Sequence, residues 1–232
     1  MHTAAGHRKR VKERFRKEGL DSFEEVHVLE LLLFYAIPQR DTKTLARTLL
    51  DRFGSLPLVL EATVDELLTV PGMGENTALY LKLILAAGRY YTLHRTDRPV
   101  ILDSTQKCGE YLVGHFMGQR NETVYLLCLD AKCKVLCCQK VGEGDVNSAN
   151  VPIRRMVEMA LGVNATTVIL AHNHPSGLAV PSIEDRQTTE RLAGALGAMD
   201  IIMADHIIVA DNDWTSLLQS GLYRAEECRL AL

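Results

Sequence analysis

The spacing of apolar residues changes once along this 232-residue chain, and that change constrains the fold more than any other feature. Up to about residue 92, leucines recur every three or four positions, as they do along one face of an α-helix. The predicted helices span 21–37, 44–53, 63–68 and 75–91. A long stretch of this kind without a strand pattern predicts an all-α domain over residues 1–92.

Beyond a charged segment with a proline at 93–101, which we interpret as a linker, short β-rich runs alternate with helical patterns. The predicted strands span 123–130, 133–141, 166–171 and 205–210, and the predicted helices span 104–116, 153–161 and 183–199. This alternation predicts an α/β (α+β) domain over 102–232, with helices packed on a central sheet. Two domains also suit the chain length, since most domains have about 100–150 residues.

Charge is distributed unevenly between the two predicted domains. Residues 1–98 contain 15 basic and 13 acidic side chains, whereas residues 99–232 contain 11 and 16. The near-neutral total argues against a protein that is basic throughout, as chromatin proteins are. Residues 1–17 nevertheless contain seven basic side chains and one acidic, including Arg8, Lys9 and Arg10. This basic arm either contacts a nucleic-acid backbone or forms a solvated helix face.

Apolar runs are too short for a membrane protein, because a spanning helix needs about 20 apolar residues. The charged N-terminus lacks the apolar core of a secretory signal, so we expect a cytoplasmic protein with no membrane partner. The cysteines lack the C-x2-C spacing of structural zinc sites, and we expect them to be reduced and mostly buried. They are Cys108, Cys128, Cys133, Cys137, Cys138 and Cys228.

The segment from Ala171 to Gly177, AHNHPSG, follows a predicted strand directly. His172 and His174 are two residues apart, so in extended chain they face the same side and can bind one metal ion. Asp185 falls in the first turn of the next predicted helix, from which a carboxylate can point back toward the strand end. Two imidazoles and a carboxylate form a three-ligand zinc set with its fourth position open, as in catalytic zinc sites.

Several residues near this set also have ordinary structural interpretations. Ser182 and Asp185 fit a helix cap, although a cap that fixes the carboxylate would also help it to bind metal. Asp205 or His206 is a candidate to orient a metal-bound imidazole, with ordinary polar contacts at a strand start as the alternative. Asn173 should point to the opposite face and hold a loop.

A glycine-rich turn, VPGMG at 70–74, precedes the predicted helix at 75–91. Gly72 and Gly74 allow close backbone approach, and a helix N-terminus offers N–H groups to a phosphate. Glu75 places a negative charge at the same point, however, so a turn that serves packing or protein contacts is the alternative.

The pattern His172-x-His174-x7-Ser182-x2-Asp185 resembles the JAMM motif of MPN-domain metallopeptidases. The string HNHPSG with the later DHIIV at 205–209 resembles the RadC family in particular. The resemblance covers nearly the whole chain, since it includes GHR at 6–8, residues 29–38 with Arg40-Asp41, and PGMG at 71–74. It implies a helix-hairpin-helix domain followed by an MPN/JAB-type domain with a central mixed sheet.

The resemblance also implies roles for individual residues. His172, His174 and Asp185 would bind one Zn²⁺ per chain, and Ser182 would hydrogen-bond the tetrahedral oxyanion. The general base would be a glutamate on an early strand, for which Glu122 is the best match and Glu143 and Glu158 are the alternatives. The implied activity is hydrolysis of peptide or isopeptide bonds. The alternative is a DNA-binding accessory factor of repair or recombination, with a structural or degenerate metal site and non-specific DNA contacts through the first domain.

Overall fold

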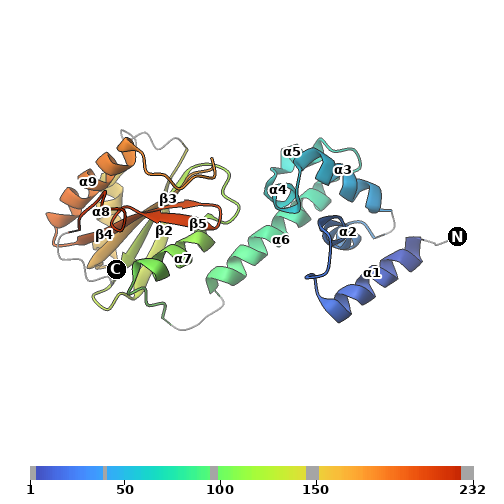
Figure 1. Cartoon of the computed structure of the whole chain (residues 1–232), viewed down its shortest axis with the longest axis horizontal. Helices are drawn as coiled ribbons and strands as arrows, with labels where there is room; N and C mark the ends of the chain where they lie inside the picture. The colour runs from blue at the N-terminus through green and yellow to red at the C-terminus, as the bar shows by residue number, and fades with distance from the viewer. Residues whose placement is uncertain (1–3, 39–40, 95–98, 145–151, 226–232) are drawn as a thin grey trace. The chain divides into compact units, whose positions relative to one another are not determined.

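The computed structural model describes residues 4–38, 41–94, 99–144 and 152–225 of the chain. Two compact units, Met1–Tyr90 and Tyr91–Leu232, are distinguished by their internal contacts (Figure 1). The segment expected to be a linker, 93–101, begins within the last turn of a long helix and includes residues 95–98, which lie outside the described ranges.

The first unit is built of helices. They are α1 (Ala4–Glu18), α2 (Glu25–Ala36), α3 (Lys43–Phe53), α4 (Leu56–Glu61), α5 (Val64–Leu68) and α6 (Glu75–His94). Buried leucines from four of them, among them Leu29, Leu49, Leu67 and Leu81, form the core of this unit. The sequence pattern missed the short helix α4, which has Ser55 as its cap and a proline in its first turn.

The second unit contains a five-stranded sheet in the order β2-β1-β3-β4-β5. The strands are β1 (Thr123–Leu129), β2 (Val135–Glu143), β3 (Thr167–Asn173), β4 (Ile202–Ala210) and β5 (Asp213–Ser216). β3 and β4 are parallel and the other neighbours are antiparallel, so the predicted mixed sheet is confirmed. β5 has only four residues, too few for a two-residue period to be recognised.

Helices cover both faces of the sheet, as Figure 1 shows. Alternate residues of β1 contact α8 (Ile153–Gly162) and α9 (Ile183–Gly197) on one face, where Leu126, Met156 and Leu192 are buried together. The intervening residues face α7 (Thr105–Phe116), where Leu127 and Leu112 are buried. The fully buried strands β1 and β3 are therefore fixed in register between two apolar layers.

Two sequence expectations can be compared with this fold directly. Cys108 and Cys128 are buried, and Cys133, Cys137 and Cys138 are half-buried, whereas Cys228 lies outside the described residues. None of the helices in the described ranges is long and apolar enough to cross a membrane.

Candidate metal centre

The candidate ligands come together because β1 and β3 run antiparallel. Val124 pairs with His172, so the residue just before β1 lies beside the end of β3. β3 continues through His172 and Asn173, two residues beyond its predicted end, and α9 begins ten residues after that strand, at Ile183. Residues far apart in sequence thus meet at one end of the inner strands, where β1 begins and β3 ends.

The nitrogens of the two histidines lie close to the carboxylate of Asp185. The Nε2 atoms of His172 and His174 are 2.8 Å apart. His172 Nε2 lies 3.1 Å from Asp185 Oδ1, and His174 Nε2 lies 3.7 Å from Asp185 Oδ2. Tetrahedral zinc with bonds of about 2.0–2.1 Å separates its ligand atoms by about 3.3 Å. The two separations that involve His172 Nε2, 2.8 Å to His174 Nε2 and 3.1 Å to Asp185 Oδ1, are close to that value, so these donors lie near enough to share such an ion.

Glu122 is the fourth group of the cluster. Glu122, His172 and His174 each bring one ligand atom to within 4.8 Å of one another, and this group could hold a metal ion. Glu122 Oε1 is 4.0 Å from His172 Nε2, farther than the carboxylate of Asp185. The side chain of Glu122 is 23% exposed and that of Asp185 only 8%, so Glu122 lies on the solvent side of the centre.

Ser182 and Asp185 form the capping box that the sequence suggested at the start of α9. Asp185 Oδ2 accepts hydrogen bonds from the backbone N–H and the hydroxyl of Ser182, at 2.7 and 2.6 Å. Asp185 N–H in turn donates to Ser182 Oγ at 3.0 Å. The cap occupies Oδ2 and leaves Oδ1 directed at His172, so capping and metal binding use different oxygens.

Electrostatics keeps the carboxylate of Asp185 ionised. Burial alone would raise its pKa, but the hydrogen bond and charge of His172, with the hydrogen bonds from Ser182, hold the pKa well below its usual range. Metal ligands must be deprotonated, and this carboxylate meets that condition throughout the physiological pH range.

The other candidate glutamates lie outside the cluster. Glu143 accepts hydrogen bonds from Lys140 and Asn121, and Glu158 accepts one from Arg154. Both carboxylates are exposed partners of surface cations. Of the three candidate bases, Glu122 is therefore the one that the structure brings to the candidate metal ligands His172 and His174.

Hydrogen bonds on the remote nitrogens orient both imidazoles. His174 Nδ1 lies 3.1 Å from the carbonyl oxygen of Leu178 and must donate to it, so the lone pair of a neutral His174 is on Nε2, which lies 2.8 Å from His172 Nε2. His172 Nδ1 lies 2.8 Å from His206 Nε2. Ligand histidines in metal sites usually have such partners.

Asp205 and His206 are consecutive on β4 and point to opposite faces of the sheet, so only one of them reaches the centre. His206 contacts His172, and its burial keeps its pKa well below the usual value. Asp205 instead accepts hydrogen bonds from Ser216 Oγ and the backbone N–H of Leu218. Burial raises the pKa of Asp205 to about 6.

Asn173 faces away from the two histidines and holds the loop before β1, as expected. Its Oδ1 accepts from Thr123 N–H, and its Nδ2 donates to the carbonyl oxygens of Gln119 and Asn121. The sequence alone could not show that these bonds grip the chain on either side of Glu122, because they join positions about 50 residues apart.

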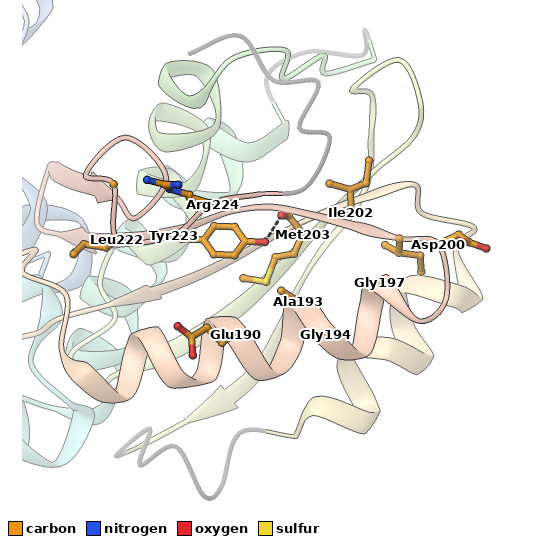
Figure 2. A pocket seen from close by; sticks show the side chains of 12 residues that line it. Glu190, Ala193, Gly194, Gly197, Asp200, Ile202, Met203, Leu222, Tyr223 and Arg224 are labelled. Carbon is orange, nitrogen blue, oxygen red and sulfur yellow. Dashed lines mark hydrogen bonds between the residues drawn. The ribbon is translucent and has the colours of Figure 1, made fainter.

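A hollow of about 1120 Å³ lies elsewhere on this unit. It is bordered by α9, the start of β4 and residues 221–224, and Figure 2 shows Tyr223 donating a hydrogen bond to the carbonyl of Met203. None of the candidate metal or catalytic residues lines it. The candidate metal-binding and catalytic residues therefore lie outside this hollow, at the end of the sheet where β1 begins and β3 ends.

The candidate phosphate-binding residues lie in the first unit. Gly72 has a φ of +90°, which a side chain would strain, and Gly74 accepts the first backbone bonds of α6. Arg8 donates to the carbonyls of Ile37 and Pro38 and so closes the end of α2. Lys9 and Arg10 are exposed on α1. The arm is thus helical, and Arg8 has a structural role within it.

Comparison with known proteins gives results that agree with the resemblance noted in the sequence. The profile of a family described as RadC-like JAB domain matches residues 102–222. A UPF0758 protein of Fusobacterium nucleatum is 34% identical over 224 residues, covering 94% of this chain and 97% of the relative. UPF0758 proteins of Stutzerimonas stutzeri and Nitrosococcus oceani are 36% and 35% identical, covering 91% and 92% of this chain and 95% of each relative.

Proposed function

The chain belongs to the RadC family of JAB-domain proteins, and from this we propose that it is a zinc-dependent hydrolase of peptide or isopeptide bonds. The observation that carries the proposal is the convergence of His172, His174 and Asp185 beside Glu122. Three protein ligands with a solvent-facing side are typical of catalytic zinc sites, whereas structural sites are closed by four.

His172, His174 and Asp185 would hold one zinc ion per chain. Zinc bound there would lower the pKa of a bound water to about 7 and polarise a scissile carbonyl. The separations between the donors and the ionised state of Asp185 support this ligand set.

Glu122 is the proposed general base. Its carboxylate is more distant from His172 than that of Asp185 and is more exposed, which suits a group that contacts water and not the metal. It would accept a proton from the attacking water and pass it to the leaving amine.

Ser182 is the proposed stabiliser of the oxyanion. Its hydroxyl donates to Asp185 in this state, so it must redirect its proton to reach a tetrahedral intermediate. The hydroxyl lies beside a carboxylate of the ligand set, which supports the assignment.

Apolar side chains next to the centre support a polypeptide substrate. Leu178, Val180 and Ile183 are 67%, 65% and 69% exposed. Leu178 and Val180 lie between β3 and α9, and Ile183 is the first residue of α9. Single exposed apolar residues are ordinary, but three within six positions beside a reactive site suit contact with a substrate chain. The cysteines among the described residues form no disulfide, which suits a reducing compartment, so we assign this activity to the cytoplasm.

The test is hydrolysis by the zinc-loaded full chain of a mixed-sequence peptide library and of lysine-linked isopeptides. Cleavage by the wild type that is lost in Glu122→Gln, with zinc retained, supports the proposal. Cleavage that is equal in both proteins would overturn the assignment of Glu122 and point to a contaminating protease.

A second candidate is non-specific DNA binding by the first unit. The turn at 70–74 has the backbone shape that only glycine adopts easily, and it leads directly into α6. With the exposed Lys9 and Arg10, this turn supports contact with a phosphate backbone. Such contacts would position the protein on DNA without reading its sequence.

A further inference from the structure

A chain of hydrogen bonds extends from the candidate metal centre into the interior of the domain. His206 lies between His172 and Thr189, with His172 Nδ1 2.8 Å from His206 Nε2 and Thr189 Oγ1 2.7 Å from His206 Nδ1. All three residues are 1% exposed. They come from β3, β4 and α9, so three separate elements are joined at this point.

The far end of the chain fixes the direction of every proton in it. Thr189 Oγ1 lies 2.6 Å from the backbone carbonyl of Asp185, and because a carbonyl can only accept, the single hydroxyl proton points there. Thr189 Oγ1 must then accept from His206 Nδ1–H. A histidine that binds metal through Nε2 carries its proton on Nδ1, so His172 Nδ1–H donates to His206 Nε2.

The hydrogen bonds of His206 are complete. The ring is buried, and each of its nitrogens has one partner, Thr189 Oγ1 for Nδ1 and His172 Nδ1 for Nε2. With its proton on Nδ1, His206 donates to Thr189 and accepts from His172, so both nitrogens are satisfied.

We propose that Thr189 is a positioning residue for the metal centre. Through His206 it keeps a proton on His172 Nδ1, so that Nε2 is the nitrogen available to the metal ion. The chain ends on the backbone of Asp185, a second proposed ligand, because residues 185 and 189 are one helical turn apart on α9. Thr189 therefore links the two proposed ligands His172 and Asp185, whose donor atoms Nε2 and Oδ1 lie 3.1 Å apart.

This inference rests on the proposed metal site. The affinity of that site for Zn²⁺ tests it, and no substrate is needed for the measurement. Partners of this kind typically change metal affinity by about 10–100-fold. We expect Thr189→Val to weaken the Kd for Zn²⁺, measured by competition with a chromophoric chelator at about pH 7.5, by about tenfold or more. Thr189→Ser restores the hydroxyl and should restore the affinity.

Thr188→Val is the matched control, because Thr188 is its immediate neighbour and is also buried. It should leave the Kd unchanged. Thermal unfolding of each variant separates a general loss of stability from a specific loss of affinity. Equal Kd values for a folded Thr189→Val protein and the wild type would overturn the inference.

A spectroscopic measurement covers the case in which Thr189→Val does not fold. In metal-free, ¹⁵N-histidine-labelled wild type, His172 should show a protonated Nδ1 whose proton exchanges slowly with water, and His206 should show a protonated Nδ1 and an unprotonated Nε2. An unprotonated Nδ1 on His172 would overturn the inference. Absence of zinc binding by the wild type, with these tautomers present, would instead count against the proposed function alone.

Discussion

The side-chain oxygen of Asn173 accepts a hydrogen bond from the backbone N–H of Thr123 at 2.7 Å. The same amide donates to the carbonyl of Asn121 at 3.1 Å, so one side chain binds both peptide groups that flank Glu122. Asn173 itself stands between the two metal-binding histidine candidates in the sequence. The candidate base and the candidate ligands are thereby fixed to one another by a residue that needs no contact with substrate.

Replacing Asn173 should displace the candidate base Glu122 and leave the candidate metal ligands in place. Asn173→Ala leaves the buried N–H of Thr123 without its partner, and an unsatisfied buried donor costs about 1–3 kcal/mol. We expect that decrease in the free energy of unfolding, measured in urea, with zinc content retained and hydrolysis reduced. Asn76→Ala, on an exposed face of α6, is the control and should change neither. Loss of zinc from folded Asn173→Ala would show that this residue supports the ligands and not the base.

Much of the fold was predictable because its elements have strong local signals. The capping box of Thr63 and Glu66 marked the start of α5, and runs of apolar, β-branched residues marked β1 and β3. The same signals predicted a central sheet with helices packed on it, whereas the mixed strand directions, which are also confirmed, were expected from the family resemblance. α4 and β5 were missed, since elements of six and four residues are too short to show a clear helical or strand period.

In the candidate site, too, some residues could be grouped from the sequence and others only from the fold. His172, His174, Ser182 and Asp185 lie within 14 positions, and local spacing is enough to group them. The contacts of Asn173 and Thr189 depend on β1, β4 and α9 meeting in space, which no local pattern encodes. Glu122 could be proposed through the family resemblance, but its 4.0 Å separation from His172 required the strand register.

Zinc binding should depend on the histidine pair. The purified protein should contain about one zinc per chain, measured by mass spectrometry of the metal after dialysis, and His174→Ala should lose it because two protein ligands hold zinc poorly. His94→Ala is the control, since His94 lies at the end of α6, outside the candidate metal centre, and should leave zinc content unchanged. Full zinc retention in His174→Ala would refute the ligand assignment.

Glu122→Gln separates the two roles open to this carboxylate. As a base, Glu122 can be replaced without loss of zinc, and the hydrolysis rate should fall by about 10²–10⁴-fold, the usual contribution of general acid–base catalysis. As a ligand, its replacement would release the metal. Zinc content and rate are therefore measured on the same sample, with Glu143→Gln as a surface control that should change neither.

DNA binding by the first unit should be electrostatic. Affinity for a short duplex, measured by fluorescence anisotropy, should fall steeply with salt because phosphate contacts release counterions. Replacing Lys9 and Arg10 with glutamate should weaken binding on all sequences and reduce the salt slope by about one for each phosphate that the variant no longer neutralises. The same change at Lys132 and Lys134 in the second unit is the control. Affinity that is unchanged when residues 1–92 are removed would exclude this activity for the first unit.

The buried carboxyl of Asp205 should make stability depend on pH. Burial raises its pKa from 3.8 to about 6, so between these values the folded state holds a proton that the unfolded state has released. Its contribution to stability is therefore complete below about pH 4 and is lost as the pH rises through about 6, with a total on the order of 3 kcal/mol. Asp205→Asn keeps an acceptor for Leu218 N–H but cannot ionise. Relative to wild type, this variant should gain unfolding free energy between about pH 4 and 7, measured in urea, and parallel curves for the two proteins would show that Asp205 stays ionised in the fold.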